Sequence, residues 1–99
     1  MDDRRSIIVI DDHAIFRAGV VQILSASPNL EVVGQGASAG DAVSLAATLQ
    51  PDLALIDISM PGGGIAAARE IHARWPGVKI VMLTVSEEED IVLQALEAG

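Results

Sequence analysis

The sequence predicts a single α/β domain with a doubly wound parallel sheet and helices on both of its faces. Short apolar runs alternate four times with amphipathic helical patterns, which is typical of parallel strands buried on both sides. The 99 residues, of which 51% are hydrophobic, suit one small domain. Its core must be aliphatic, because Phe16 and Trp75 are the only aromatic residues.

The first half of the chain supplies two predicted strand–helix units. The run SIIVI, residues 6–10, is short, continuous and β-branched, as in a strand without a solvent-facing side. An apolar stripe at helical spacing predicts a helix over 13–27, which ends before Pro28. Residues 31–36 form the second predicted strand, and the apolar spacing of 39–50 predicts a second helix. The stripe of the first helix consists of Ile15, Phe16, Gly19, Val20, Ile23 and Leu24.

The second half repeats the alternation. Residues 52–57, DLALID, are a short apolar run that ends in an acid, and the proline and three glycines of 59–64 predict a loop. A third helix is predicted over 65–75 and a fourth strand over 79–84. The last predicted helix covers 86–99, where a serine suits the N-cap and four acids follow at the positive end of the helix dipole.

Composition and charge exclude several classes of function. The formal charge is −8, from 14 acids against 6 bases, which argues against non-specific binding to nucleic acid or to an anionic membrane. The absence of cysteine excludes disulfides, thiolate metal sites and a cysteine nucleophile. The N-terminal MDDRRS precedes an apolar run of only four residues, too short for a signal peptide or a membrane span. We therefore expect a cytoplasmic protein.

Three acids fall at the ends of predicted strands. Asp11 and Asp12 end the first strand and Asp57 ends the third, while Thr84 ends the fourth. Ligands in such folds sit at the carboxyl ends of the strands. Three close carboxylates repel one another, and a divalent cation such as magnesium, which prefers oxygen ligands, relieves the repulsion. Taken singly, Asp12 could instead cap the next helix and Asp57 could be a turn residue.

Three motifs carry a resemblance to a known family. The stretches IIVIDDHAIFRAGV, PDLALIDISMPGGG and KIVMLTVSEEEDIVLQALEAG resemble the receiver domain of two-component response regulators, most closely the NarL-like group that precedes a LuxR-type output domain. The resemblance covers essentially the whole chain. It implies a flavodoxin-like sheet with strand order 2-1-3-4, and a receiver domain over residues 1–99 that lacks the fifth strand and fifth helix. A C-terminal helix-turn-helix output domain is expected in the full protein.

The resemblance also implies roles for individual residues. Asp57 matches the phosphoacceptor, which takes a phosphoryl group from a sensor histidine kinase. Asp11, Asp12 and Asp57, with the backbone carbonyl of Ser59, match the magnesium (Mg2+) ligands. Thr84 matches the switch hydroxyl that turns toward the phosphoryl group. The implied protein is a signalling module rather than an enzyme; it contacts DNA only through its output domain and no membrane, and a homodimer is a further possibility.

Other interpretations remain open. The family's catalytic lysine has no counterpart in this chain, because the only lysine, Lys79, starts the fourth strand and so lies at the wrong end of the sheet. A pseudo-receiver that binds partners without phosphorylation is therefore one alternative. A magnesium-dependent aspartyl phosphohydrolase is another, although DDHA lacks the D-x-D pattern of that class. Neither His13 nor His72 is expected to bind metal, although His13 lies close enough to the acids to touch the phosphoryl chemistry.

Overall fold

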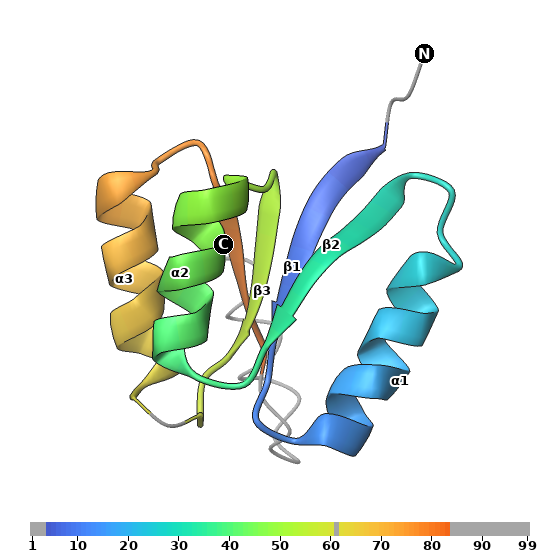
Figure 1. Ribbon diagram of the computed structural model, residues 1–99, viewed down its shortest axis with the longest axis horizontal. Helices are drawn as coiled ribbons and strands as arrows, with labels where there is room; N and C mark the ends of the chain where they lie inside the picture. Colours follow the sequence, from blue (N-terminus) through green and yellow to red (C-terminus); the bar gives the residue numbers. More distant parts are fainter. Residues whose placement is uncertain (1–3, 61, 84–99) are drawn as a thin grey trace.

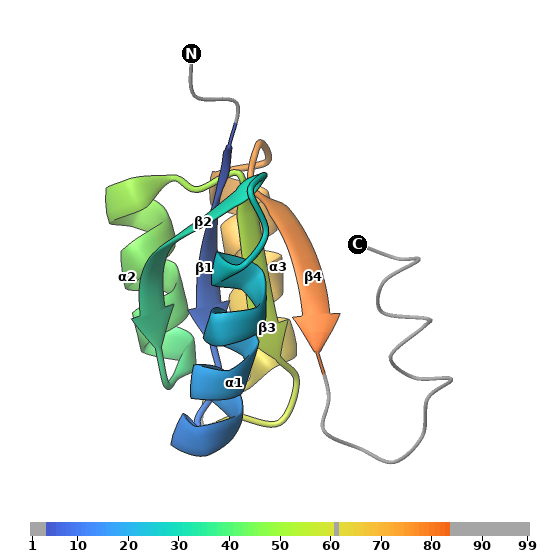
Figure 2. The ribbon, with the colours of Figure 1, turned by 90° about the vertical axis from the view of Figure 1, so that its right-hand side faces the viewer.

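The computed structural model describes residues 4–60 and 62–83, which form a four-stranded parallel sheet with three helices. The strands lie in the order β2-β1-β3-β4, as predicted, and all four arrows point the same way in Figure 2. The expected helix over 86–99 and residue Thr84 lie outside the described residues. The strands are β1 (Arg5–Ile10), β2 (Leu30–Gly36), β3 (Leu53–Asp57) and β4 (Lys79–Leu83).

The helices confirm the predicted alternation, and their ends differ from the predicted bounds by two residues or fewer. They are α1 (Ala14–Ser25), α2 (Ala39–Leu49) and α3 (Gly64–Arg74). Figure 1 shows α2 and α3 on one face of the sheet and α1 on the other. None of them has both the length and the apolar character needed to cross a membrane, within the part of the chain that the structure describes.

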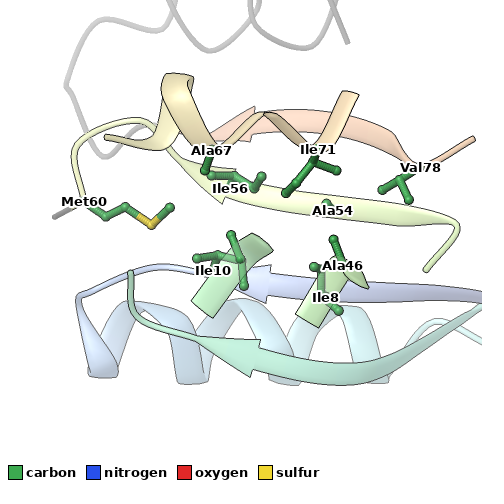
Figure 3. Close-up of a cluster of buried hydrophobic side chains, with 10 residues drawn as sticks. Ile8, Ile10, Ala46, Ala54, Ile56, Met60, Ala67, Ile71 and Val78 are labelled. Atoms are coloured by element: carbon green, nitrogen blue, oxygen red, sulfur yellow. The ribbon is translucent and has the colours of Figure 1, made fainter. Parts of the chain in front are cut away.

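The core lies between the sheet and the α2/α3 layer. Figure 3 shows its side chains, which come from β1, β3, α2, α3 and their connections. Alanines on both helices let α2 and α3 approach each other and the sheet closely. Burial of this aliphatic surface is the main term that stabilises the fold. The cluster consists of Ile8, Ile10, Ala42, Ala46, Ala54, Ile56, Met60, Ala67, Ile71 and Val78.

The α1 face is packed differently. The predicted helix is present, but none of its residues is buried. Ile15 is 91% exposed and Ile23 is 73% exposed, although both belong to the predicted apolar stripe. Only α1 covers this face among the described residues, where it contacts β1 and β2. Helical periodicity therefore predicted the helix correctly, but it did not report how much of the stripe is buried.

Candidate metal centre

The acids that follow β1 and β3 meet at one edge of the sheet. The two strands are direct neighbours, and Ile10 pairs with Ile56 in register. Asp11 and Asp57 are therefore the next residues at the same edge, and both are buried, at 1% and 0% exposure. Asp12 is more exposed. Ligand atoms of Asp11, Asp12, His13 and Asp57 all lie within 4.8 Å of one another.

Backbone contacts hold Asp11 in place. Its N–H donates to the carbonyl of Gly36 at the end of β2, at 3.0 Å. Its own carbonyl accepts a hydrogen bond from Arg17 Nη1 at 2.6 Å, and the same nitrogen lies 3.4 Å from the Gly36 carbonyl oxygen. The Arg17 guanidinium thus joins the ends of β1 and β2 from the first turns of α1. The carboxylate oxygen Oδ1 of Asp11 accepts from the backbone N–H of His13 at 2.7 Å.

Asp57 is buried with half of its hydrogen-bonding capacity unused. Its Oδ1 accepts from the Ser59 N–H at 3.1 Å, while its Oδ2 has no hydrogen-bond partner among the described residues. Burial raises the pKa of the Asp57 carboxyl, and the negative charges of Asp11 and Asp12 add to this effect, against the Ser59 N–H and His13. The charged form is thus destabilised, and a cation would compensate it.

The glycine-rich loop after β3 passes directly over the end of that strand. Gly62 and Gly63 have φ angles of 87° and 89°, a region that side chains other than hydrogen rarely occupy. A Cβ on Gly64 would overlap the Asp57 carbonyl oxygen and lie 2.8 Å from its carbonyl carbon. The Gly64 N–H lies 3.3 Å from the carbonyl oxygen of Ile58, to which it donates. The loop therefore needs glycine to close over Asp57.

His13 lies inside the acidic cluster, where sequence reasoning expected no ligand. Its Nδ1 is 3.0 Å from Asp12 Oδ1, 3.2 Å from Asp11 Oδ1 and 3.9 Å from Asp57 Oδ2. Its position directly after the acid pair was the signal in the sequence. Arg17 was missed as well, although it is the only lysine or arginine between residues 6 and 68. The other histidine, His72, is exposed on α3.

The donor set fits a divalent cation. Asp11 Oδ2 and Asp57 Oδ2 are both buried and have no partner in the described part of the chain. Buried polar atoms are normally satisfied, and an unsatisfied carboxylate oxygen is costly. Ser59 is exposed, and it contacts Asp57 through its backbone N–H. Its carbonyl and Thr84, which lies outside the described residues, remain predicted participants.

Comparison with known proteins identifies the family. A model of the response regulator receiver domain matches residues 7–99. The chain belongs to this receiver family. Its fold agrees with solved receivers: the receiver domain of the response regulator NarL from Mycobacterium tuberculosis superposes with a TM-score of 0.82 at 35% identity, over 98% of this chain and 79% of that one. The resemblance expected from the three motifs is therefore confirmed.

Curated relatives of this receiver are response regulators. The transcriptional regulatory protein DegU of Brevibacillus brevis is 38% identical over 99 residues, which is 99% of this chain and 42% of DegU. The response regulator protein VraR of Staphylococcus epidermidis is 42% identical over 94% of this chain and 45% of VraR. The receiver thus spans less than half the length of these relatives, and they are consistent with the NarL/LuxR-type group.

Proposed function

We propose that this receiver accepts a phosphoryl group on Asp57 from a sensor histidine kinase, in a magnesium-dependent reaction, and thereby switches a DNA-binding transcriptional output. One observation carries the proposal. Asp57 is completely buried at the end of β3, yet its Oδ2 is unpartnered and faces a cluster with two further carboxylates. A structural acid would be hydrogen-bonded, whereas a nucleophile and metal ligand needs a free oxygen.

The proposed transfer uses few groups. A bond forms between an Asp57 carboxylate oxygen and phosphorus, while the bond between phosphorus and the imidazole nitrogen of the kinase breaks and leaves its electron pair on that nitrogen. Phosphoryl transfer depends mainly on positioning and on neutralising charge. Asp11, Asp12 and Asp57, with the Ser59 carbonyl, would hold magnesium. When bound, magnesium offsets the carboxylate charge and the charge on the phosphoryl oxygens.

The residues around the acids support this role by holding them still. Arg17 and Gly36 fix the backbone of Asp11, and the Ser59 N–H orients one oxygen of Asp57. Positioning of this kind reduces the reorganisation that a reaction requires. After transfer, the added charge at Asp57 would be read by the Thr84 hydroxyl and passed to the segment that follows β4.

The wider role follows from the relatives. DegU is named a transcriptional regulatory protein, and the chain spans less than half of its length. We therefore propose that residues 1–99 form a receiver that is incomplete at its C-terminus, in a protein with a helix-turn-helix output domain. The expected setting is the cytoplasm, with a homodimer as a further possible state and with DNA contacted only through the output domain.

The test is the intact mass of the protein after incubation with magnesium and acetyl phosphate. Wild type should gain one phosphoryl group and Asp57→Asn none. Asp52→Asn is the matched control, since Asp52 adjoins the other end of β3, and it should gain one group as wild type does. Uptake by Asp57→Asn equal to that of wild type would place the acceptor elsewhere. Magnesium affinity, measured on the same samples by calorimetry, should be weakened in Asp12→Ala.

One observation favours the pseudo-receiver as a second candidate. Lys79, the only lysine of the chain, begins β4 at the edge opposite the acids, and its N–H donates to the Asp52 carbonyl there. No lysine of this sequence is thus available to pair with a phosphoryl group on Asp57. Magnesium binding without any gain of mass, in this chain and in the natural full-length protein, would favour the pseudo-receiver. Turnover of a small phosphomonoester would favour the hydrolase.

A further inference from the structure

We propose that His13 is a nitrogen ligand of the metal site, so that this receiver binds manganese, or a similar divalent transition ion, in preference to magnesium. The inference deepens the proposed function, because it concerns the same carboxylates, but it does not require phosphoryl transfer to occur. It assigns to the cluster a fourth side-chain donor besides the three acids and the Ser59 carbonyl. The consequence is a site whose donors are oxygens and one imidazole.

The position of the His13 ring is the first observation. Its Nδ1 approaches oxygens of all three acids, at 3.0 Å from Asp12, 3.2 Å from Asp11 and 3.9 Å from Asp57. Atoms that ligate one cation gather in this way, because each must lie within about 2 to 2.3 Å of the ion. The ring therefore lies among the ligand atoms rather than beside them.

The two buried carboxylate oxygens are an independent second observation. Asp57 Oδ2, which is the Asp57 oxygen nearest to His13 Nδ1, has no hydrogen-bond partner within the described ranges, and the same holds for Asp11 Oδ2. Both side chains are at least 99% buried. Oxygens left in this state require a cation more than they require a further hydrogen-bond donor. They therefore point to an ion at the place that the imidazole already faces.

The local backbone explains why the ring is available. His13 is the N-cap residue of α1, with extended backbone angles of φ −93° and ψ 99°, and its side chain makes no capping hydrogen bond. Its own N–H is bound to Asp11 Oδ1 at 2.7 Å. This contact fixes the turn that carries both residues. A capping residue whose side chain does not cap is free to serve the cluster that its backbone faces.

The chemistry of the donors determines the selectivity. Magnesium favours oxygen ligands and seldom takes imidazole, whereas manganese, cobalt and nickel bind carboxylate and imidazole together. Affinity for divalent ions of the first transition row also rises from manganese toward copper at such sites. An imidazole added to three carboxylates therefore raises the affinity for these ions with little effect on magnesium. The expected signature is a change in the ratio of two affinities.

The experiment compares metal binding by wild type, His13→Ala and His13→Asn in the absence of any phosphodonor. His72→Ala is the matched control, because His72 is the other histidine and lies exposed on α3. Calorimetry gives the magnesium and manganese affinities. Electron spin-echo spectroscopy of bound manganese reports directly whether an imidazole nitrogen is a ligand. Thermal melts without metal check that each variant is folded.

Wild type and His72→Ala should show nitrogen coupling to manganese, and both His13 variants should lose it. The preference for manganese over magnesium should fall about tenfold in His13→Ala, which corresponds to about 1.4 kcal/mol. Wild-type manganese without nitrogen coupling would overturn the proposal. So would a His13→Ala variant that binds both ions equally more tightly, since the ring would then act as a competing cation. Phosphoryl uptake on Asp57 is measured separately with magnesium, so either proposal can fail alone.

Discussion

The two ends of β3 carry an aspartate each, and the two residues behave in opposite ways. Asp52, just before the strand, is exposed, and its Oδ2 accepts from the N–H and the hydroxyl of Ser6, at 2.8 and 3.2 Å. Its own N–H donates to the Ser6 hydroxyl at 3.0 Å. Asp57, at the other end, is buried, receives one hydrogen bond and keeps an unpartnered oxygen within the described chain. Asp52 therefore ties β3 to β1, whereas Asp57 is left available for a ligand.

The glycines near the two ends differ in the same way. A Cβ on Gly64 would overlap the carbonyl of Asp57, whereas a Cβ on Gly77, in the turn before β4, would meet nothing within 4 Å. The carboxyl end of the strand is thus closely packed around a poorly satisfied acid. The amino end is open and its acid is fully satisfied. This contrast indicates that the protein tolerates an energetic cost only at the end where the chemistry is proposed.

The largest effect is expected from Gly64→Ala. The added methyl group would collide with the Asp57 backbone, which cannot move without disturbing β3, so the free energy of unfolding should fall by about 3 kcal/mol. Gly77→Ala is the control, and it should change stability by less than about 0.5 kcal/mol. Urea unfolding of the two variants measures both values. Equal stability of the two variants would contradict the close approach at Gly64.

Asp57→Asn should stabilise the metal-free protein at pH 7 by roughly 1 to 2 kcal/mol. Burial raises the pKa of Asp57 from the ordinary 3.8, so above pH 3.8 the folded state holds its proton more tightly than the unfolded state. Wild-type stability therefore falls as the pH rises through this window, and the loss persists at neutral pH. The difference between the two proteins should vanish below pH 3.8. Unfolding in EDTA at several pH values tests this prediction.

An Asp57→Asn variant less stable than wild type at pH 7 without metal would show that the carboxylate is satisfied after all. Saturating magnesium should reverse the order, because it stabilises only the protein that binds it well.

Arg17→Met should lower stability by about 1 kcal/mol, since it removes charged hydrogen bonds to the Asp11 and Gly36 carbonyls. Magnesium binding should weaken as well, because Asp11 loses an anchor. Arg74→Met is the matched control: Arg74 pairs with Glu70 at 2.9 Å and lies over the Trp75 ring, near the other end of the sheet. It should affect stability to a similar or smaller degree and leave magnesium affinity unchanged, as measured by calorimetry. Equal losses of affinity in both variants would remove Arg17 from the site.

The smallest effect is expected from Asp52→Ala. The loss of its hydrogen bonds to Ser6 should cost about 0.5 to 1 kcal/mol, because the pair is exposed and water replaces the missing partner. Phosphoryl uptake and magnesium affinity should match those of wild type. A combined loss of stability and metal binding would show that the two ends of β3 are coupled. Thermal unfolding and calorimetry on one preparation measure both quantities.

Part of this site was predictable from residue order alone. Alternating apolar runs and helical stripes predicted the strands and helices, and the acids after two of the strands predicted where the carboxylates would gather. Local patterns carry this information because strand ends and breakers are properties of short stretches. The same patterns could not show that α1 would leave Ile15 and Ile23 exposed. Periodicity reports which residues share a face, not what covers it.

By itself, the sequence determined the order of the elements, the sign of the charge at the sheet edge and the family to which the chain belongs. Only the tertiary structure decided which acid is structural and which is free, since Asp52 and Asp57 look alike on either side of LALI. The same holds for His13 and Arg17, whose roles depend on oxygens of β1, β2 and β3. Burial and hydrogen bonding are properties of neighbours in space, and those neighbours are separated along the chain by up to 46 residues.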